Sequence, residues 1–465
     1  MELLDYLKWR NDVSLSVSPF NDIDNVILSY ISYMNFDELF SDNEGIYGIE
    51  EVLKTFCKKY SLDEIKDKGQ FTERSPLLLE QMVAGERFRE TRIGYYRDIF
   101  DKEKIKQFSA VTFFLPDKTN YIAFRGTDST ITGWKEDFMM SCMSETEGTK
   151  EALDYLNDVS KLIKGDFMLG GHSKGGNFAM YAAACNDEIK KRITKIYNND
   201  GPGFREEIIN TEEYKQIVNK IYSIVPQTSI IGQLLSNEGE QKVVKSSAKG
   251  IFQHDAMTWE VMRDEFVESK LDDMSNFINV SLGTWLEKTD DETRESLVST
   301  VFALIEETEA KTFKEFGGNL LKNVGIIIKS LVKLIDVANK NNVKAVMIGD
   351  ESRFDPDIRK GIQKLVDATS KNTGMTFAFA INYGGRDEIK RAIEHIVDDA
   401  AAGVISKENI NEELISSYLD TKNLLDPDLL IRTSGELRVS NFLLWQIAYS
   451  EFYITDTLWP DFDEK

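Results

Sequence analysis

A serine, a histidine and an aspartate in the first half of the chain are of the types that catalyse acyl transfer. Ser173 stands in Gly171-His172-Ser173-Lys174-Gly175, a G-x-S-x-G sequence. A nucleophile in a tight strand-to-helix turn has a strained backbone, and neighbouring residues with side chains would collide there. The N–H groups and positive dipole end of the following helix could stabilise a developing oxyanion. The pattern therefore predicts a nucleophilic serine, with an incidental serine in a glycine-rich turn as the alternative.

A nucleophilic serine needs a general base, and the chain contains three histidines. His172 lies inside the motif, where a structural role is expected, and His395 belongs to a predicted helix far along the chain. His254 follows the last predicted strand of the same region and is the expected base. Asp200, which ends a predicted strand before a Gly-Pro-Gly turn, is the expected third member; Asp255 adjoins the histidine but should point elsewhere. The resulting chain order of serine, aspartate and histidine is that of α/β-hydrolases.

A second cluster, near the end of the chain, has the residue types that bind phosphate. Arg432, Arg438 and Ser440 lie in "RTSGELRVSN", ahead of a predicted helix over residues 440–452. Guanidinium groups bind phosphate oxygens in pairs, and a serine and free N–H groups at a helix start complete such a site. Glu451, about three turns further along this helix, could hold a Mg²⁺ bound to a pyrophosphate. The alternative is a capped helix with solvated arginines.

The elements that position these residues alternate between strands and helices. Residues 1–100 are predicted to be mostly helical, and a hairpin over residues 109–126 follows. Further strands are predicted at 166–171, 193–200, 221–226 and 241–247, with a helix at 175–185. Amphipathic helix is predicted for 257–339, and then strand 344–350, helix 358–370, strand 375–385 and helix 386–400. The pattern predicts an α/β protein with a mostly parallel sheet and a second α/β unit starting near residue 340.

Length and composition narrow the classes of protein. The 465 residues suffice for two or three domains, and the net charge of -23 argues against nucleic acid or an anionic membrane as the main partner. The three cysteines lie far apart and read as free thiols in a reducing compartment. The N-terminus lacks the apolar run of a signal peptide, and the apolar segment 323–338, broken by Lys329 and Lys333, is too short for a transmembrane segment. We therefore expect a cytoplasmic protein.

The first part of the chain resembles a known class of enzymes. The sequences "FRGTD" (124–128), "GWKED" (133–137) and "GGHSKGGN" (170–177) are similar to those of class 3 lipases and a related bacterial hydrolase family, over about residues 1–335. The resemblance implies an α/β-hydrolase domain at 1–337 with helical N-terminal and C-terminal additions, and no cofactor. It also implies that Thr127 and the N–H of Lys174 bind the oxyanion, and that Asp137 is a structural acid.

The lipase resemblance has one departure, which concerns the acid of the triad. These lipases carry the acid after a later strand, in a D-x-V-P-like sequence, whereas this chain has Ser223 in "YSIVPQT". The acid has therefore either moved to Asp200 or been lost. The segment 229–240 could be a lid over an acyl pocket or an ordinary surface loop.

The last part of the chain resembles the cis-prenyltransferases, the undecaprenyl diphosphate synthase family. The resemblance covers residues 338–465, including "VKAVMIGD", "KNTGMTFAFAINYGGRDEI" and "DPDLLIRTSGELRVSNFLLWQ". It implies that Arg432, Arg438 and Ser440 bind the headgroup of isopentenyl diphosphate and that Glu451 binds Mg²⁺. The family's D-G-N-G-R-W-A loop and F-S-T-E-N-W motif are absent from the chain, so this unit is a truncated one that lacks the catalytic aspartate.

Truncation of a parallel sheet leaves unpaired edges and exposed apolar faces. The tail is therefore expected to form a homodimer or to pair with an intact cis-prenyltransferase. The leading hypothesis for the whole chain is a serine hydrolase that acts on small-molecule or lipid esters through an acyl-enzyme. The alternative is a cis-prenyltransferase remnant or partner-dependent transferase, and the second alternative is a non-catalytic fusion or chimaera.

Overall fold

The chain folds into two compact units. The computed structural model describes residues 1–40, 45–68, 71–128, 130–272, 275, 290–306, 308–312, 315, 335–340, 342–354, 356–432 and 437–454. The first unit runs from Met1 to Glu295 and the second from Ser296 to Asp463. This division falls earlier in the chain than the boundary near residue 337 that the sequence predicted. The two units are described separately below.

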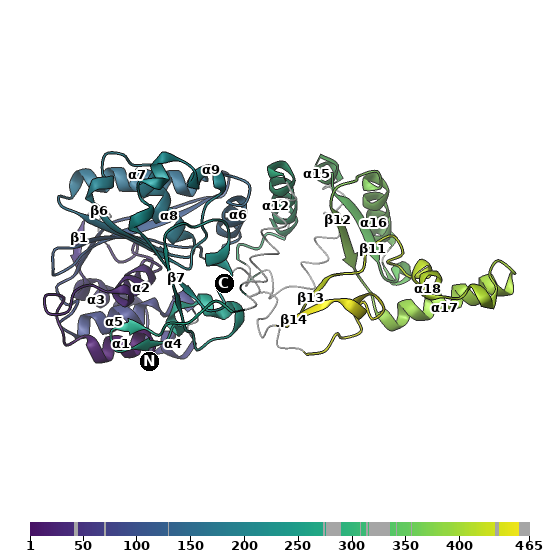
Figure 1. Cartoon of the computed structure of the whole chain (residues 1–465), viewed down its shortest axis with the longest axis horizontal. Coiled ribbons are helices and arrows are strands. Elements are labelled where there is room, and N and C mark those ends of the chain that lie inside the picture. Colours follow the sequence, from purple (N-terminus) through teal and green to yellow (C-terminus); the bar gives the residue numbers. More distant parts are fainter. Residues whose placement is uncertain are drawn as a thin grey trace. The chain divides into compact units, whose positions relative to one another are not determined.

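An eight-stranded sheet forms the centre of the first unit, with its strands in chain order (Figure 1). The strands are β1 Ile46–Gly48, β2 Arg92–Asp101, β3 Lys106–Phe114, β4 Asn120–Phe124, β5 Phe167–His172, β6 Ile193–Asn199, β7 Ile221–Pro226 and β8 Glu240–Val244. The pairs from β1 to β4 are antiparallel, and those from β4 to β8 are parallel. The predicted hairpin and the four later strands are confirmed, but only the second half of the sheet is parallel.

Helices cover both faces of this sheet (Figure 1). On one face lie α1 Leu3–Arg10, α2 Asp22–Ile31, α3 Ile49–Lys59, α4 Leu62–Lys68 and α5 Ser75–Ala84. On the other lie α7 Glu147–Leu162 and α8 Lys174–Ala184, whose alanine-rich sequence lets it approach the strands closely. Helices α6 Ile131–Met139, α9 Glu206–Ile209 and α10 Glu212–Lys215 complete this part of the unit. Each face has its own apolar core, so the sheet is buried on both sides.

Helix α2 is buried along nearly its whole length, including polar residues. Asp24 and Arg87 are fully buried, and the Arg87 Nε donates to the Asp24 carboxylate over 2.9 Å. A buried charge is tolerated only when it is paired. This ion pair therefore allows α2 to pack against the sheet, where it contacts β5.

The prediction that residues 1–100 are mostly helical is confirmed for five helices and wrong for β1 and β2. Strand β2 has the sequence "RIGYYRDIFD", rich in aromatic and β-branched residues that favour strands. Its pairing with β3 shifts register between Gly94 and Arg97, where Tyr95 has a φ of 53°. Such an irregularity interrupts the alternation of apolar and polar residues that marks a strand in sequence.

Only part of the predicted amphipathic helix over 257–339 lies in the described residues. The prediction is wrong for residues 261–266, which form the short antiparallel pair β9 Val261–Met262 and β10 Glu265–Phe266, and it is confirmed for the helices α12 Asp291–Glu306 and α15 Ile335–Lys340. The rest of the prediction falls outside the described residues.

The second unit contains two small parallel sheets. Its elements are β11 Lys344–Ile348, α16 Pro356–Thr369, β12 Thr376–Ala380, α17 Gly385–Ala401, α18 Glu412–Tyr418, β13 Leu429–Arg432 and β14 Glu451–Ile454. Strand β11 pairs with β12, and β13 pairs with β14. The strands and helices predicted between 344 and 400 are confirmed. Phe377 on β12 and Phe452 on β14 are 37% and 48% exposed, which is unusual for parallel strands and agrees with the expectation of uncovered apolar faces.

The predicted helix over residues 440–452 is wrong. The chain makes turns before a short 3₁₀ helix, Gln446–Tyr449, and Glu451 begins strand β14. Asn441, with a φ of 65°, accepts the Gly385 N–H with its carbonyl and the Arg386 N–H with its side chain, at 2.6 and 2.8 Å. Asn441 thus caps helix α17, and this tertiary contact overrides the local helical pattern.

Candidate active site

Ser173 occupies a sharp turn between β5 and α8. Its backbone has φ 58° and ψ -135°, a conformation that residues with side chains rarely adopt. A methyl group on Gly171 would lie 2.3 Å from the backbone of Gly175, and one on Gly175 would lie 2.1 Å from the Phe124 carbonyl oxygen. The glycines therefore allow α8 to start close against β4 and β5. Strained residues of this kind cluster at functional sites.

His254 and Asp200 form a buried pair. The His254 Nδ1 lies 2.6 Å from Asp200 Oδ2, and both residues are less than 10% exposed. Asp200 follows β6 directly and has a φ of 51°. Its other oxygen accepts the Ser229 hydroxyl at 2.5 Å and the Gly232 N–H at 3.2 Å. These contacts fix the orientation of the carboxylate and of the imidazole that it holds.

The sheet brings this pair to the turn that carries Ser173. Strands β5 and β6 are parallel, and the Ser173 N–H donates to the Asn199 carbonyl at 2.9 Å, so Ser173 and Asp200 leave neighbouring strands at the same edge. The rings of His172 and His254 are 4.4 Å apart. Within the described part of the chain, no hydrogen bond joins the Ser173 hydroxyl to His254. Such catalytic hydrogen bonds often form only when a substrate is bound.

His172 makes the contacts of a structural residue. Its Nε2 lies 2.8 Å from the His254 carbonyl oxygen, and its Nδ1 lies 3.0 Å from the Tyr33 hydroxyl. The first contact requires a proton on Nε2, so Nδ1 accepts from Tyr33. Burial, and then the neighbouring His254, hold the pKa of His172 well below its usual value. A neutral His172 thus fastens the backbone of His254.

The other positions at which the triad acid could lie do not reach His254. Asp255 turns away from it, and accepts the Tyr30 hydroxyl at 2.9 Å and the Met257 N–H at 3.0 Å. Ser223, at the position where the lipases carry their acid, is fully buried and accepts the Asn237 side-chain amide at 2.5 Å. Among the candidates that the sequence offered, Asp200 alone contacts the histidine ring.

The segment 229–240 anchors the acid. Besides the contacts of Ser229 and Gly232 with Asp200, the Leu234 carbonyl accepts the Gly203 N–H at 2.8 Å, and Ile231 is buried. The segment is thus bound to the residues on both sides of it. These attachments favour a fixed loop over the lid that was one alternative for this stretch.

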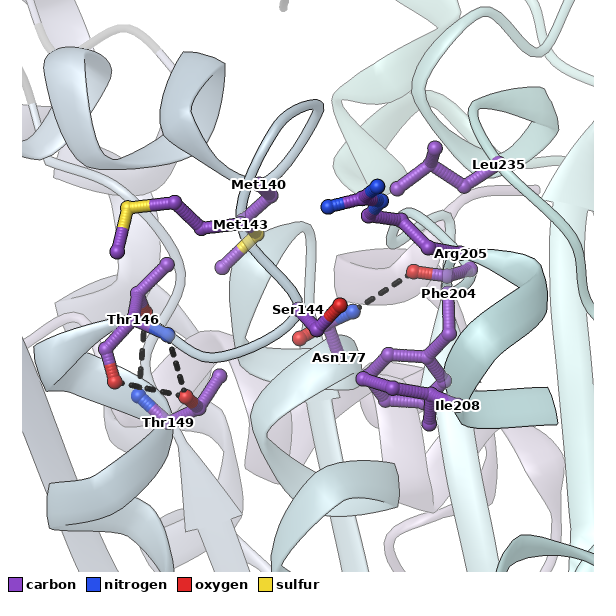
Figure 2. A pocket seen from close by; sticks show the side chains of 11 residues that line it. Met140, Met143, Ser144, Thr146, Thr149, Asn177, Phe204, Arg205, Ile208 and Leu235 are labelled. Atoms are coloured by element: carbon purple, nitrogen blue, oxygen red, sulfur yellow. Dashed lines mark hydrogen bonds between the residues drawn. The ribbon is translucent and has the colours of Figure 1, made fainter. Parts of the chain in front are cut away.

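A largely apolar hollow lies beside the first turns of α8 (Figure 2). Its apolar lining consists of Met140, Met143, Phe204, Ile208 and Leu235. Figure 2 shows the two methionines on one side, the other apolar residues opposite, and Asn177 between them. Asn177 follows Ser173 by one helical turn, and its side-chain amide donates to the Gly203 carbonyl at 2.8 Å. The hollow therefore begins one turn of helix away from the serine.

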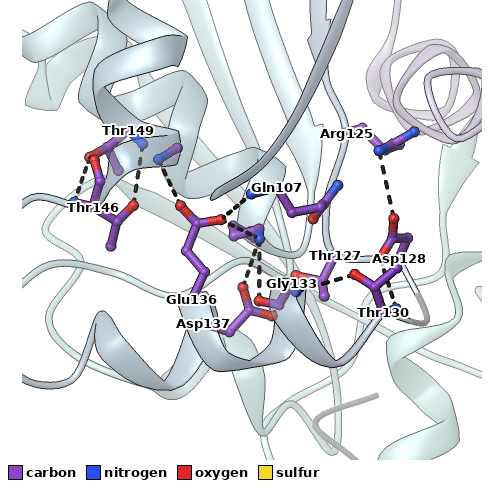
Figure 3. Close-up of polar contacts among 12 residues, drawn as sticks. Gln107, Arg125, Thr127, Asp128, Thr130, Gly133, Glu136, Asp137, Thr146 and Thr149 are labelled. Atoms are coloured by element: carbon purple, nitrogen blue, oxygen red, sulfur yellow. Dashed lines mark hydrogen bonds and ion pairs between the residues drawn. The ribbon is translucent and has the colours of Figure 1, made fainter. Parts of the chain in front are cut away.

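The loop after β4 lies against the serine. It leads to a buried ionic network around Glu136 and Asp137 (Figure 3). A methyl group on Gly126 would lie 3.0 Å from the Cβ of Ser173, so the next residue, Thr127, is close to the turn. The Thr127 hydroxyl donates to Asp137. The Lys174 ammonium lies 3.2 Å from the same carboxylate and 3.0 Å from Glu136. Burial raises the pKa of Asp137 to about 6, and the charge of Lys174 and the hydroxyl of Thr127 oppose the rise.

The backbone N–H of Lys174 is the first of helix α8. Amides in the first turn have no partner within their own helix and point along the helix axis. This N–H and that of Thr127 belong to the two segments that meet at Ser173. The residues predicted to bind an oxyanion are thus brought to the serine. Glu136, which has no motif of its own in the sequence although it adjoins Asp137, contacts the Lys174 ammonium behind them.

In the second unit, two of the residues predicted to bind a diphosphate lie together. The Arg432 Nη2 donates to the Ser440 hydroxyl at 3.0 Å, and Arg438 is exposed two residues before that serine. Glu451 is exposed at the start of β14. Among the described residues, no three histidine, cysteine or carboxylate side chains gather into a metal site. Glu451 therefore offers a single carboxylate to a cation.

Comparison with known proteins divides the chain in the same way. Residues 298–465 match the family described as putative undecaprenyl diphosphate synthase. Isoprenyl transferase from Bacillus anthracis is 51% identical over 126 residues, and that from Clostridium perfringens is 46% identical over 138 residues. These alignments cover 27% and 30% of this chain, and 49% and 54% of the relatives. The chain thus spans about half the length of the curated relatives it matches, and its tail is similar to isoprenyl transferases.

Two solved structures are similar to about a third of the chain. A crystal structure of lavandulyl diphosphate synthase from Lavandula x intermedia, in complex with dimethylallyl diphosphate, is 32% identical, with a TM-score of 0.28. It is matched over 30% of this chain and 64% of its own. A probable undecaprenyl diphosphate synthase from Campylobacter jejuni is 34% identical, with a TM-score of 0.26, over 31% of this chain and 67% of its own.

The first unit has a family match of its own. Residues 82–303 match the family described as Mbeg1-like. This range includes the turn at Ser173, Asp200 and His254. Helices α1 and α2 precede this match, as do Tyr30 of α2, which contacts Asp255 in the histidine loop, and Tyr33 just after α2, which contacts the His172 ring. No helix in the described ranges has both the length and the apolar character needed to cross a membrane.

Proposed function

We propose that the first unit is a serine hydrolase of the α/β-hydrolase type, which cleaves carboxylic esters through an acyl-enzyme. The observation that carries this proposal is the buried His254–Asp200 pair at the sheet edge where Ser173 stands in a strained turn. The arrangement combines a nucleophile, a base and a group that orients the base. The Mbeg1-like match, to a lipase-like family, agrees with it.

The proposed reaction uses these groups in two halves. The Ser173 oxygen attacks the ester carbonyl carbon while the His254 Nε2 takes its proton, and Asp200 holds the Nδ1–H of the imidazolium. The oxyanion accepts the N–H groups of Lys174 and Thr127. The tetrahedral intermediate then expels the alcohol, which receives the proton from His254. Water repeats the sequence on the acyl-enzyme and releases the acid.

We propose that the acyl group of the ester lies in the hollow of Figure 2. Methionine side chains adapt their shape to apolar ligands, and Met143 is 41% exposed at the rim. The hollow starts at Asn177, one turn beyond the nucleophile, and its volume is only about 10 Å³, so a chain attached to the Ser173 oxygen would enter it only as the methionine side chains moved aside. Apolar acyl chains, including those of lipids, are therefore the proposed substrate class.

Ester hydrolysis by the full chain tests the proposal. We expect p-nitrophenyl esters to be hydrolysed, and activity to be lost in Ser173→Ala and His254→Ala. His395→Ala is the matched control, since His395 is exposed on α17 in the second unit. Hydrolysis that persists in Ser173→Ala would remove this function.

A second function is proposed for the tail, which the comparisons support more directly than hydrolysis by the first unit. We propose that Arg432, Arg438 and Ser440 bind the diphosphate of isopentenyl diphosphate. The hydrogen bond between Arg432 and Ser440 and the 51% identity to an isoprenyl transferase favour it. Glu451 would hold Mg²⁺ only together with diphosphate oxygens, because it offers one carboxylate.

Transfer of an isoprenyl group would need the half of the relatives that this chain does not match. We propose that an intact cis-prenyltransferase supplies it, through the exposed strands β12 and β14, because a second copy of this chain would lack the same half. Isothermal titration of the full chain with isopentenyl diphosphate and Mg²⁺ tests the binding step. We expect heat that is lost in Arg432→Ala and kept in Arg359→Ala, an exposed arginine on α16.

These two tests also address the remaining alternative, a non-catalytic fusion. Such a protein would show neither Ser173-dependent hydrolysis nor Arg432-dependent binding. Ser173-dependent hydrolysis alone would assign a function to the first unit only, and Arg432-dependent binding alone would assign one to the second unit only.

A further inference from the structure

The lysine of the G-x-S-x-G motif is buried, which is unusual for a charged residue. The Lys174 side chain is 1% exposed at the start of α8. Its ammonium contacts Glu136 at 3.0 Å, Asp137 at 3.2 Å and the Gly133 carbonyl oxygen at 3.4 Å, all on helix α6. A buried ammonium needs such partners, because its desolvation is costly. The contacts join the helix that follows the nucleophile to the helix that follows the oxyanion loop.

The carboxylates of Asp137 and Glu136, which bind the Lys174 ammonium, also accept hydrogen bonds from separate segments (Figure 3). Asp137 accepts the hydroxyl of Thr127. Glu136 accepts the Gln107 N–H at 3.0 Å, in β3, and the Gly148 N–H at 2.7 Å, in α7. Glu136 is thereby held by the rigid part of the unit, and Lys174 is the only cation that an ion pair joins to either carboxylate in the described residues.

We propose that the side chain of Lys174 is a positioning residue that sets the distance between the nucleophile turn and the oxyanion loop. Its own backbone N–H is one expected oxyanion donor, and its side chain fixes the loop that carries the other, at Thr127. Both donors would then face one oxygen atom. This inference rests on the proposed hydrolase function.

The charge of Lys174 also governs the proton on Asp137. The titratable groups that face Asp137 are Lys174 from α8, Glu136 from its own helix and Tyr33 from the segment after α2. Burial raises the pKa of Asp137, and Lys174 lowers it. Without the ammonium, Asp137 keeps its proton to a higher pH. When the solution is acidified, Asp137 is therefore protonated at a higher pH than in the wild type, and the charged carboxylate that accepts the Thr127 hydroxyl is lost at that higher pH.

Lys174→Met tests the proposal in the full chain, with Lys190→Met as the matched control. Lys190 is also a largely buried lysine, paired with Asp187 at 2.7 Å, but it precedes β6 at the opposite end from the site. In Lys174→Met we expect kcat for a p-nitrophenyl ester to fall by roughly 10- to 100-fold, less than loss of an oxyanion donor costs. KM should change little, because the ground-state ester does not use the oxyanion donors fully.

Two further readouts separate positioning from a merely structural role. The affinity for a trifluoromethyl ketone, which forms an oxyanion on Ser173, should fall in parallel with kcat/KM. The acid limb of the pH profile of kcat/KM should move to higher pH. In Lys190→Met both should stay as in the wild type, even if thermal unfolding shows a comparable loss of stability.

The proposal is overturned if Lys174→Met folds and keeps the wild-type ketone affinity and acid limb. If Lys174→Met does not fold, Glu136→Gln takes its place, because it removes one of the two carboxylates bound to the ammonium. We then expect lower kcat and lower ketone affinity, and wild-type values for both would overturn the proposal. A wild-type chain without Ser173-dependent hydrolysis would instead show that the hydrolase function itself is wrong.

Discussion

Asp200 is the residue on which the proposed triad depends, since the sequence left its role open. It follows β6, contacts the His254 ring at 2.6 Å, and is held by Ser229 and Gly232. Asp255 adjoins the histidine in sequence, but contacts Tyr30 instead. Proximity in the chain is therefore a poor guide to the acid of a triad, because the strand order decides which side chains meet.

Asp200→Asn should lower kcat for ester hydrolysis by roughly 10³- to 10⁴-fold, because an amide that donates to the imidazole favours the wrong tautomer. Asp255→Asn serves as the comparison, and its loss should be much smaller, since that residue acts only on the position of the loop. Steady-state kinetics on both variants decide between them. A large loss in Asp255→Asn with a small one in Asp200→Asn would reverse the assignment.

At the scale of elements, the close approach of α8 to β4 makes the nucleophile turn. The Cβ of an alanine at position 175 would lie 2.1 Å from the Phe124 carbonyl oxygen, so the helix would have to shift. This packing explains why a strained backbone at Ser173 is retained. The glycines of the motif could be read from the sequence, but the partner that they face could not.

Gly175→Ala should therefore reduce the free energy of unfolding by about 1–3 kcal/mol and lower kcat, because overpacking displaces the start of the helix. Gly48→Ala is a suitable control, since no atom lies within 4 Å of the added methyl group. Urea unfolding and ester hydrolysis measure the two effects. Wild-type stability and activity in Gly175→Ala would show that the helix start is not constrained as described.

The hollow beside α8 is formed by four segments of the chain. Met143→Trp should fill the rim and lower kcat/KM for a p-nitrophenyl octanoate by roughly 10- to 100-fold relative to the acetate. Met262→Trp is the control, because Met262 is 65% exposed and lies outside the lining. An unchanged preference for chain length in Met143→Trp would mean that the acyl group binds elsewhere.

Elements that carry their own pattern could be predicted from the sequence, and those that depend on partners could not. The hairpin of β3 and β4 and the strands β5 to β8 have short apolar runs between turn residues, and the structure has them. The register shift in β2 hides its alternation, and the contact of Asn441 with α17 prevents the helix expected at 440–452. The candidate serine came from a local motif, the base from elimination among three histidines and the acid from the end of a predicted strand, whereas Ser229, Tyr33 and Glu136 have no such signal in the sequence.

At the scale of the whole molecule, the two units have separate cores and separate candidate sites. The proposed triad, both oxyanion segments and the ionic network all lie within residues 1–295. The net charge of -23 is a sum over the whole chain. It does not prevent Arg432 from lying next to Ser440, which are two of the residues predicted to bind a diphosphate. Global charge therefore says little about either site.

Residues 1–337 alone should fold and hydrolyse esters with the kcat/KM of the full chain, because no group of the proposed site comes from the second unit. Expression of this fragment, circular dichroism and ester kinetics provide the measurement. The fragment with Ser173→Ala is its control. A folded fragment without activity would show that the second unit contributes to the site.

The central claim, that Ser173 forms an acyl-enzyme, is tested most directly by mass spectrometry of the intact protein. The full chain is mixed with p-nitrophenyl butyrate, quenched in acid within the first turnover and digested with a protease. We predict one added butyryl group, on the peptide that carries Ser173, and none in Ser173→Ala. A butyryl group on another residue, or ester hydrolysis without any acylated protein, would contradict the account.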